Sequence, residues 1–239
     1  MKNLTHCECV MTTLTVIIPV KDEEVGLEFL VEDFKKSSLS KKYDVEFIFV
    51  IDIRTSDSSK FIAKKLSSNI IDQKETTGKG AAMKQAIEAW KAKPSEIIIF
   101  LDADGSYSFD SVSKLASEIE NGAEVVSGSR FLSSTGRPLG MSRLHNFGNR
   151  MLSRISSIRN RRYISDLCTG LWGFSEKSLF SLPIKSNGFD LEAELAGLCR
   201  RKKLNHKEIQ VDWSQRKGGT SKLRSITDGF IIFLRILRT

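Results

Sequence analysis

Short apolar runs alternate with segments of helical periodicity along the first half of the chain. The run Leu14–Ile18 ends at Pro19 and predicts a buried strand, and the more apolar run Ile97–Leu101 leads directly into Asp102. Between such runs, apolar residues recur with the period of an amphipathic helix. This alternation predicts an α/β fold with a parallel sheet covered by helices on both faces. The expected strands are 14–18, 45–51, 70–71, 97–101 and 125–126, and the expected helices are 25–34, 58–66, 81–92 and 111–119.

The pattern changes after Ser127, where the segment 128–165 is dense in arginine. Further strands are expected at 171–174 and 209–213, and a helix at 191–198. A basic loop with two adjacent glycines, 216–222, then leads into a last helix that is apolar from Phe230 to Leu234. No internal repeat or low-complexity linker interrupts the chain, so we expect one domain.

The net charge of the chain limits the classes of binding partner to expect. The 239 residues carry a formal charge of +8, which favours nucleic acid, an acidic lipid surface or phosphorylated small molecules. The four cysteines show neither a disulfide framework nor the paired spacing of a zinc site, which is typical of a reduced, cytosolic protein. No signal peptide and no run of about 18 apolar residues is present. We therefore expect a protein that is soluble or attached to a surface without spanning it.

Acidic residues follow three of the expected strands, at the edge of a parallel sheet where ligands collect. Glu23 lies just after the first strand, Asp52 ends the second, and Asp102 and Asp104 follow the fourth. Two carboxylates in a D-x-D pattern suit one hard cation, and Gly105 allows a sharp turn after them. Mg²⁺ or Mn²⁺ takes few protein oxygens and adds substrate phosphates. The alternative is an aspartate-rich turn that caps the next helix, but its position behind a buried strand favours the metal site.

Several short motifs follow one another from about Thr15 to Leu223. They are V-I-I-P-V-K-D-E-E, V-I-D, G-K-G-A-A, D-A-D-G, G-S-R-F, S-D-L-C-T-G, G-F-D-L-E-A-E and R-K-G-G-T-S-K-L. In this order they resemble the inverting glycosyltransferases of family 2, in the branch that makes polyprenyl-phosphate (dolichyl-phosphate) sugars. The resemblance implies a GT-A fold, with a Rossmann-like, mostly parallel sheet. Within a single domain, 1–239, it implies a nucleotide-sugar half at about 14–127, a small acceptor half at 128–225 and a C-terminal amphipathic helix at 226–239.

The resemblance also implies where the donor binds. Pro19 and Glu23 match the motif that lines the nucleoside pocket, and Asp52 matches the residue that contacts the base. In this chain the family stretch D-D-G-S-x-D-x-T lacks its second Asp and its Gly. The identity of the nucleotide base is therefore left open, and Arg54 becomes a candidate phosphate contact. The other residues implied to bind the nucleotide sugar are Gly78 and Lys79 of the G-K-G loop, Asp102 and Ala103, and Arg216 and Lys222 of a loop that closes over the diphosphate.

The resemblance implies that Arg130 lies where the family binds the acceptor. Arg143, Asn146 and Arg150 recur at i, i+3 and i+7, one face of a helix that would suit a phosphate, a lipid headgroup or plain solvent. The segment 190–194 presents an acidic residue near the sugar, for which we expect Glu192. The candidate catalytic residues are thus Asp104, Asp166, Glu192 and Arg130; the candidate metal ligands are Asp102 and Asp104; and the candidate acceptor-phosphate ligands are Arg130, Arg143 and Asn146.

The implied reaction moves a hexose from a UDP- or GDP-sugar to a polyprenyl phosphate, with inversion at the anomeric carbon and with Mg²⁺ or Mn²⁺ on the diphosphate. A lipid phosphate is already anionic and needs little general-base help, so arginines would position it. A hydroxyl acceptor would instead need a carboxylate base, Asp166 or Glu192. The apolar segment 230–238, with its arginines at lipid headgroups, favours a peripheral position on the cytoplasmic face of a membrane over docking on the protein's own core.

Three other hypotheses remain open. A family 2 enzyme with a soluble or glycan hydroxyl acceptor would work without lipid. A sugar-nucleotide-binding module without activity is kept open by the altered stretch at Asp52. A basic nucleic-acid-binding α/β protein would explain the charge of +8. It would leave the acidic strand ends unexplained, and the basic residues lack interleaved aromatic platforms, so we expect no nucleic-acid partner.

Overall fold

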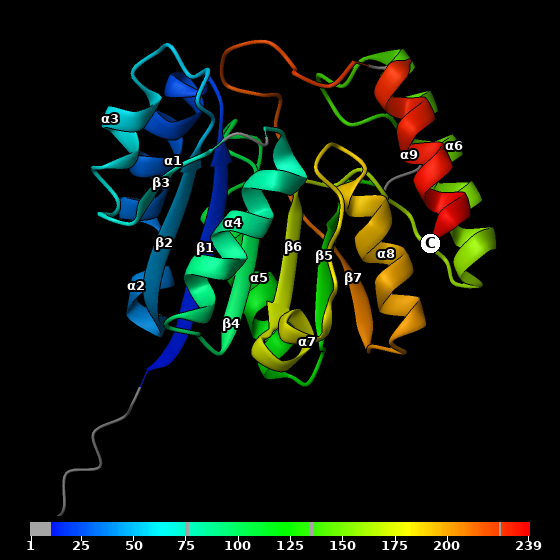
Figure 1. The fold of residues 1–239 in the computed structure, drawn as a ribbon, viewed down its shortest axis with the longest axis horizontal. Helices are drawn as coiled ribbons and strands as arrows, with labels where there is room; N and C mark the ends of the chain where they lie inside the picture. Colours follow the sequence, from blue (N-terminus) through cyan, green and yellow to red (C-terminus); the bar gives the residue numbers. More distant parts are fainter. Residues whose placement is uncertain (1–10, 75–76, 134–135, 225) are drawn as a thin grey trace, which may run out of the picture.

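Helices cover both faces of one seven-stranded sheet in the computed structural model, which describes residues 11–74, 77–133, 136–224 and 226–239 (Figure 1). The strand order is β3-β2-β1-β4-β6-β5-β7. β6 runs antiparallel to β4 and β5, and the other paired strands are parallel. The strands are β1 (Thr12–Val20), β2 (Tyr43–Ile51), β3 (Ile70–Asp72), β4 (Ile97–Leu101), β5 (Val125–Ser129), β6 (Leu171–Ser175) and β7 (His206–Gln210).

Alternating side chains of the central strands supply two hydrophobic cores, one on each face of the sheet. In β4, Ile97, Ile99 and Leu101 belong to one core, and Ile98 and Phe100 belong to the other. A strand buried on both faces reads as a continuous apolar run, which is why this one is so apolar. The first core is covered by α1 (Glu24–Lys36), α2 (Leu39–Lys42), α3 (Ser59–Ala63) and α5 (Phe109–Glu120). The second is covered by α4 (Lys79–Lys91), α6 (Arg143–Asn160), α7 (Glu176–Ser181), α8 (Leu191–Arg201) and α9 (Thr227–Arg238).

The expected fold class, a mostly parallel α/β sheet with helices on both faces, is confirmed. Most elements differ from their expected bounds by one to three residues, and the difference has a clear physical reason in two of them. The helix expected over 58–66 ends at Ala63, because the next residues form tighter i→i−3 hydrogen bonds. The strand expected over 209–213 lies at His206–Gln210, because its first residues are polar and its parallel partner β5 ends at Ser129.

Chain direction gathers several loops at one edge of the sheet. The parallel strands β1, β2, β4 and β5 end at this edge, and the antiparallel β6 begins there. The segments that follow β1, β2, β4 and β5 therefore meet the segment 165–170 that precedes β6. The loop 214–223 after β7 joins them, since Ser214 N donates to Ser106 O and Lys217 N donates to Asp104 O.

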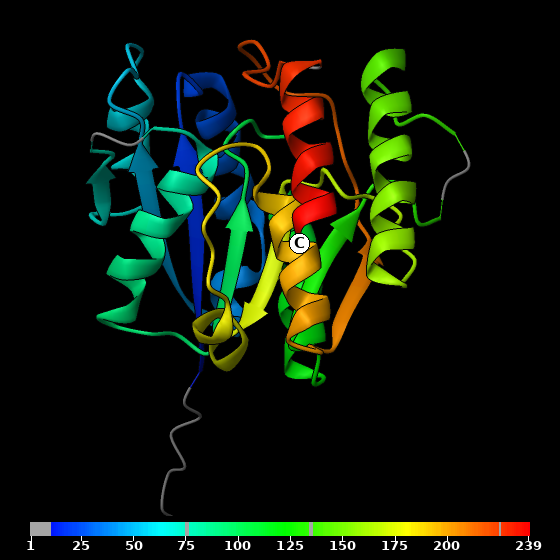
Figure 2. The same cartoon turned by 45° about the vertical axis from the view of Figure 1, so that its right-hand side comes forward.

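The C-terminal helix α9 is docked on the protein, contrary to our expectation for the segment 230–238. It lies beside α8 and α6 (Figure 2), and it buries Ile232 and Ile236 in the second core. Arg235, expected at lipid headgroups, turns inward and bonds Asp190 at 2.6 Å. The opposite face of the helix stays exposed. Among the described residues no helix is long and apolar enough to cross a membrane.

Candidate active site

Asp102 and Asp104 lie directly after β4, at the edge where the loops meet. Asp102 N donates to Gly170 O at 3.2 Å, which ties the turn to the start of β6. A Cβ atom at Gly170 would lie 1.9 Å from Asp102 Oδ2, so only glycine leaves room for this carboxylate. Asp104 Oδ1 accepts from Ser106 N at 3.0 Å, and Gly105 takes the positive φ of 69° that the turn requires. Both carboxylates remain partly exposed, at 32% and 16%.

Lys79 joins Asp102 to Glu192. Its Nζ lies 2.6 Å from Asp102 Oδ1 and 2.6 Å from Glu192 Oε1, and the Lys79 and Glu192 side chains are only 12% and 9% exposed. Burial alone would lower the pKa of Lys79, but the two carboxylates outweigh it and raise the pKa, so the ammonium stays charged. Burial raises the pKa of Glu192 in spite of Lys79. Lys79 begins α4 after Gly78, which has a φ of 110°.

Helical geometry explains why Glu192 faces this cluster and its acidic neighbours do not. Asp190 and Glu194 are four residues apart on one face of α8, and both bond Arg235 of α9. Glu192 lies between them in sequence and therefore on another face, toward Lys79. The segment 190–194 thus supplies both an anchor for α9 and a site carboxylate.

A basic loop lies against the acidic turns. Arg216 Nη1 is 2.7 Å from both carboxylate oxygens of Glu23, and its Nη2 is 3.3 Å from Asp104 Oδ2. Lys222 Nζ donates to Asp22 O at 3.4 Å. Burial raises the pKa of Glu23, although Arg216 opposes the shift. The loop expected to fold over the diphosphate therefore lies against Glu23 and Asp104.

Asp52 is paired within its own turn. Arg54 donates from Nε to Asp52 Oδ1 at 2.8 Å and from Nη2 to Oδ2 at 2.7 Å, and this bonding lowers the pKa of Asp52. Arg54, a candidate phosphate contact, is thus held by a carboxylate while its side chain stays 53% exposed. Pro19 lies half-buried near the end of β1, beside Val50 of β2. These positions put Pro19, Glu23 and Asp52 at one end of the acidic edge.

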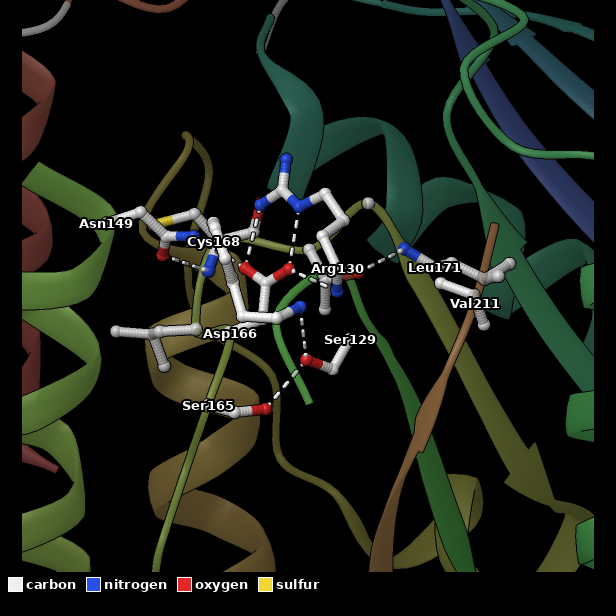
Figure 3. Close-up of polar contacts among 12 residues, drawn as sticks. Ser129, Arg130, Asn149, Ser165, Asp166, Cys168, Leu171 and Val211 are labelled. Atoms are coloured by element: carbon white, nitrogen blue, oxygen red, sulfur yellow. Dashed lines mark hydrogen bonds and ion pairs between the residues drawn. The ribbon is translucent and has the colours of Figure 1, made fainter. Parts of the chain in front are cut away.

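Arg130 and Asp166 form a buried ion pair on the other side of the site (Figure 3). Arg130 donates from its backbone N and from Nε to Asp166 Oδ2, at 3.0 and 2.6 Å, and from Nη2 to Oδ1 at 2.7 Å. Asn149 Nδ2 donates to the same Oδ1 at 2.6 Å. Arg130 Nη2 also donates to Cys168 O. Both carboxylate oxygens of Asp166 are occupied, and its side chain is 0% exposed.

The helix α6 contributes a residue that sequence reasoning missed. Of the expected set, Arg143 is exposed, and Asn146 Oδ1 accepts from Arg150 Nε at 3.4 Å. Asn149 instead reaches the ion pair and also accepts from Cys168 N. The available signal was a face of small polar residues at helical spacing, which is buried in the structure: Asn149, Ser153, Ser156 and Asn160. Uncharged polar residues that share one helix face with Leu152 are typical of a buried hydrogen-bonding face.

The donor set fits a cation that shares its ligands with a substrate. Among the residues that the structure describes, no group of three or more His, Cys, Asp or Glu side chains could hold a metal by itself. Asp102 and Asp104 offer partly exposed carboxylate oxygens, which suits Mg²⁺ or Mn²⁺ completed by phosphate oxygens.

Comparison with known proteins agrees with this geometry. Residues 15–180 match the family described as glycosyl transferase family 2, which is more than half of the chain. This match supports the glycosyltransferase hypothesis.

Curated relatives are about a quarter identical to this chain over the aligned residues. The glycosyltransferase AglJ of Haloferax volcanii is 26% identical over 93% of this chain and 70% of its own length. The dolichyl-phosphate hexose transferase of the same organism is 25% identical over 94% of this chain and 92% of its own length. The dolichol-phosphate mannosyltransferase of Pyrococcus furiosus is 25% identical over 90% of this chain and 60% of its own length.

Solved structures with the same fold include glucosyl-3-phosphoglycerate synthase from Mycobacterium tuberculosis. Its complex with phosphoglyceric acid has a TM-score of 0.73 at 16% identity, over 95% of this chain and 79% of that one. Its complex with Mn²⁺, UDP and phosphoglyceric acid has a TM-score of 0.70 at 16% identity, over 95% of this chain and 76% of that one. At this identity the likeness shows the GT-A-like fold.

Proposed function

Since this chain belongs to glycosyl transferase family 2, we propose that it transfers a hexose from a UDP- or GDP-sugar to a polyprenyl (dolichyl) phosphate at a membrane surface, with Mg²⁺ or Mn²⁺ and with inversion. Two relatives carry dolichyl or dolichol phosphate in their names, and the neighbouring solved structure was obtained with Mn²⁺ and UDP. These support the class of donor, cation and acceptor.

One observation supports a lipid phosphate as the acceptor: both carboxylates that could act as a general base are already bound by other side chains. Asp166 gives both oxygens to Arg130 and Asn149, and Glu192 is bound by Lys79. A hydroxyl acceptor must lose a proton to a nearby base as it attacks. A phosphate monoester is already an anion at neutral pH. The site therefore favours an acceptor that needs positioning by cations rather than deprotonation.

On this proposal Asp166 is a positioning residue. It orients the Arg130 guanidinium, whose remaining donors face the acceptor phosphate, while Glu208 accepts from the backbone N of Ser165 and Asp166 and fixes their loop. Asp102 and Asp104 would hold the cation, whose charge would neutralise the diphosphate leaving group. Lys79 and Arg216 lie beside those carboxylates and stabilise the same developing charge.

The exposed faces of two helices support the proposed position at a membrane surface. Four apolar side chains recur at helical spacing along one face of α6 and are exposed: Leu144, Phe147, Met151 and Ile158. The exposed face of α9 adds Phe230, Ile231 and Leu237. An apolar helix face flanked by arginines is typical of a helix that lies in a membrane interface. We propose a peripheral position on the cytoplasmic face, with this surface toward the lipid.

The test compares acceptors that differ only in the phosphate. The protein is incubated with Mn²⁺ or Mg²⁺ and a panel of UDP- and GDP-sugars, with polyprenyl phosphate in one arm and polyprenol of the same length in the other. We expect lipid-linked sugar and free nucleoside diphosphate only with polyprenyl phosphate, and loss of product when EDTA is added. Transfer to polyprenol or to a soluble sugar hydroxyl would show that the acceptor group is a hydroxyl and not a lipid phosphate. No product with any donor would refute the proposed function.

A further inference from the structure

Each carboxylate of the Asp102–Asp104 pair already has a cation from its own chain. Lys79 Nζ lies 2.6 Å from Asp102 Oδ1, and Arg216 Nη2 lies 3.3 Å from Asp104 Oδ2. The two cations come from different parts of the chain, the start of α4 and the loop after β7. A divalent cation that binds the same carboxylates must meet both positive charges at close range.

Both side-chain cations also have a second carboxylate to hold them in place. Lys79 is bound by Glu192 at 2.6 Å, and Arg216 is bound by both oxygens of Glu23 at 2.7 Å. They can therefore remain in the site after they lose the Asp102 and Asp104 carboxylates. There they are placed to meet a new anion beside those carboxylates.

We propose that Lys79 and Arg216 are built-in counter-cations of Asp102 and Asp104, so that a divalent cation binds tightly only together with a diphosphate. The cation takes the two carboxylates, and the diphosphate oxygens take the two side-chain cations. Each partner thus removes the charge that opposes the other. The inference rests on the proposed function, because it assumes that this pair is the metal site and that the donor carries a diphosphate.

Coulomb's law sets the scale of the effect. A unit charge about 4 Å from a divalent cation in a partly exposed site changes its binding by roughly tenfold or more, even when solvent screens much of the interaction. Removing one side-chain cation should therefore strengthen binding of the metal alone. It should weaken the enhancement that a nucleoside diphosphate provides, because the diphosphate loses a partner.

The experiment measures Mn²⁺ binding by electron paramagnetic resonance, without activity as a readout. Wild type, Lys79→Met and Arg216→Met are titrated with Mn²⁺ alone, with Mn²⁺ and UDP, and with Mn²⁺ and GDP. In wild type we expect the effective nucleotide to increase Mn²⁺ affinity by at least about tenfold. Each variant should bind Mn²⁺ alone at least about fivefold more tightly than wild type and should show a smaller enhancement.

Two further variants isolate the cause. Lys91→Met removes the same charge from the same helix at an exposed ion pair with Glu88, so its Mn²⁺ affinity should equal that of wild type. Lys79→Met with Glu192→Gln should keep the gain, which excludes Glu192 as a new metal ligand. Thermal unfolding verifies that each variant is folded, and Arg216→Met tests the proposal on the loop if the buried Lys79 variants unfold.

The outcomes separate this inference from the proposed function. If wild type binds Mn²⁺ more tightly with UDP or GDP, but folded Lys79→Met and Arg216→Met bind Mn²⁺ alone as wild type does, the counter-cation inference is wrong and the metal site stands. If wild type binds no Mn²⁺ even with nucleotide, the metal-dependent function itself fails, and this inference fails with it.

Discussion

Three carboxylates of this site, two of them buried, each face a nearby cation. Asp52 faces Arg54, Asp102 faces Lys79, and Asp166 faces Arg130. A charge removed from water is tolerated only when it is paired and hydrogen-bonded, so these pairs allow acidic strand ends to survive partial burial. The most exposed partner is Arg54, at 53%, and the least exposed carboxylate is Asp166, at 0%. The Arg130–Asp166 pair is nearly closed to solvent, whereas the Asp102 and Asp104 carboxylates are partly exposed.

Asp104 is the residue whose change should separate chemistry from folding. Asp104→Asn keeps the hydrogen bond to Ser106 N and leaves Arg216 bound to Glu23, so we expect the protein to stay folded. It removes a charged metal ligand, and we expect kcat/KM with Mn²⁺ to fall by about 100-fold or more. Turnover is measured with the effective donor and polyprenyl phosphate. Asp212→Asn, at an exposed ion pair with Lys114 just after β7, is the matched control and should retain full turnover. An Asp104→Asn enzyme with near wild-type turnover would remove Asp104 from the metal site.

Sequence reasoning located the acidic residues of the site but could not assign all of their partners. Asp52, Asp102 and Asp104 were predictable because they follow apolar runs, and the fold itself brings strand ends together. The pairing of Lys79 with Glu192 depends on how α4 and α8 pack, which no local pattern encodes. Asn149 was missed for a similar reason, since the spacing of Arg143 and Arg150 pointed to Asn146, and only the packing of α6 buries the neighbouring face that carries Asn149.

At the scale of elements, the decisive feature is the direction of β6. The apolar run 171–174 predicts a strand, but a run that is buried on both faces reads the same in either direction. Because β6 runs antiparallel between β4 and β5, it begins at the edge of the sheet where those two strands end. The segment that precedes β6 therefore lies at the edge that carries Asp102 and Asp104, not at the opposite edge. This brings Asp166 to Arg130 and Gly170 to Asp102.

The outer strands contain a titratable group that should make stability depend on pH. His206 begins β7; its Nε2 lies 2.8 Å from Ser127 Oγ of β5, and its ring stacks on Trp172 of β6. Burial, with Arg162 nearby, lowers the pKa of His206 from 6.5 to about 3. Below pH 6.5 the unfolded chain takes up a proton that the folded chain refuses. Stability contributed by neutral His206 is therefore lost as pH falls from 6.5 toward 3.

His206→Gln should remove this pH dependence. Between pH 7 and pH 5 we expect the free energy of unfolding of wild type to fall by about 2 kcal/mol more than that of the variant, at about 1.4 kcal/mol per pH unit. Urea unfolding at several pH values measures both proteins. Wild type and variant have the same carboxylates, so the contribution of these groups cancels when the two free energies of unfolding are subtracted. Parallel curves for the two proteins would show that His206 does not titrate differently on folding.

At the scale of the whole molecule, one end exposes apolar helix faces, which fits the proposed membrane surface. α6 and α9 lie side by side at the end of the sheet near β7, away from α3 (Figures 1 and 2). Each buries one face in the second core and exposes apolar residues on another. The net charge of +8 adds attraction to acidic lipid. Because α6 also carries Asn149 to the Arg130–Asp166 pair, the proposed membrane surface and acceptor side share one helix.

Vesicle flotation tests this surface with a matched pair of substitutions. Phe147 on α6 and Phe61 on α3 are similarly exposed, at 67% and 69%. If α6 lies in the interface, Phe147→Glu loses the burial of an aromatic ring and adds a repelled charge. We expect its affinity for vesicles of phosphatidylcholine and phosphatidylglycerol to fall by at least about tenfold. Phe61→Glu makes the same change at the opposite end of the sheet and should float as wild type does. Equal losses for both variants would indicate attraction by overall charge alone, and no binding by wild type would place the acceptor away from a membrane.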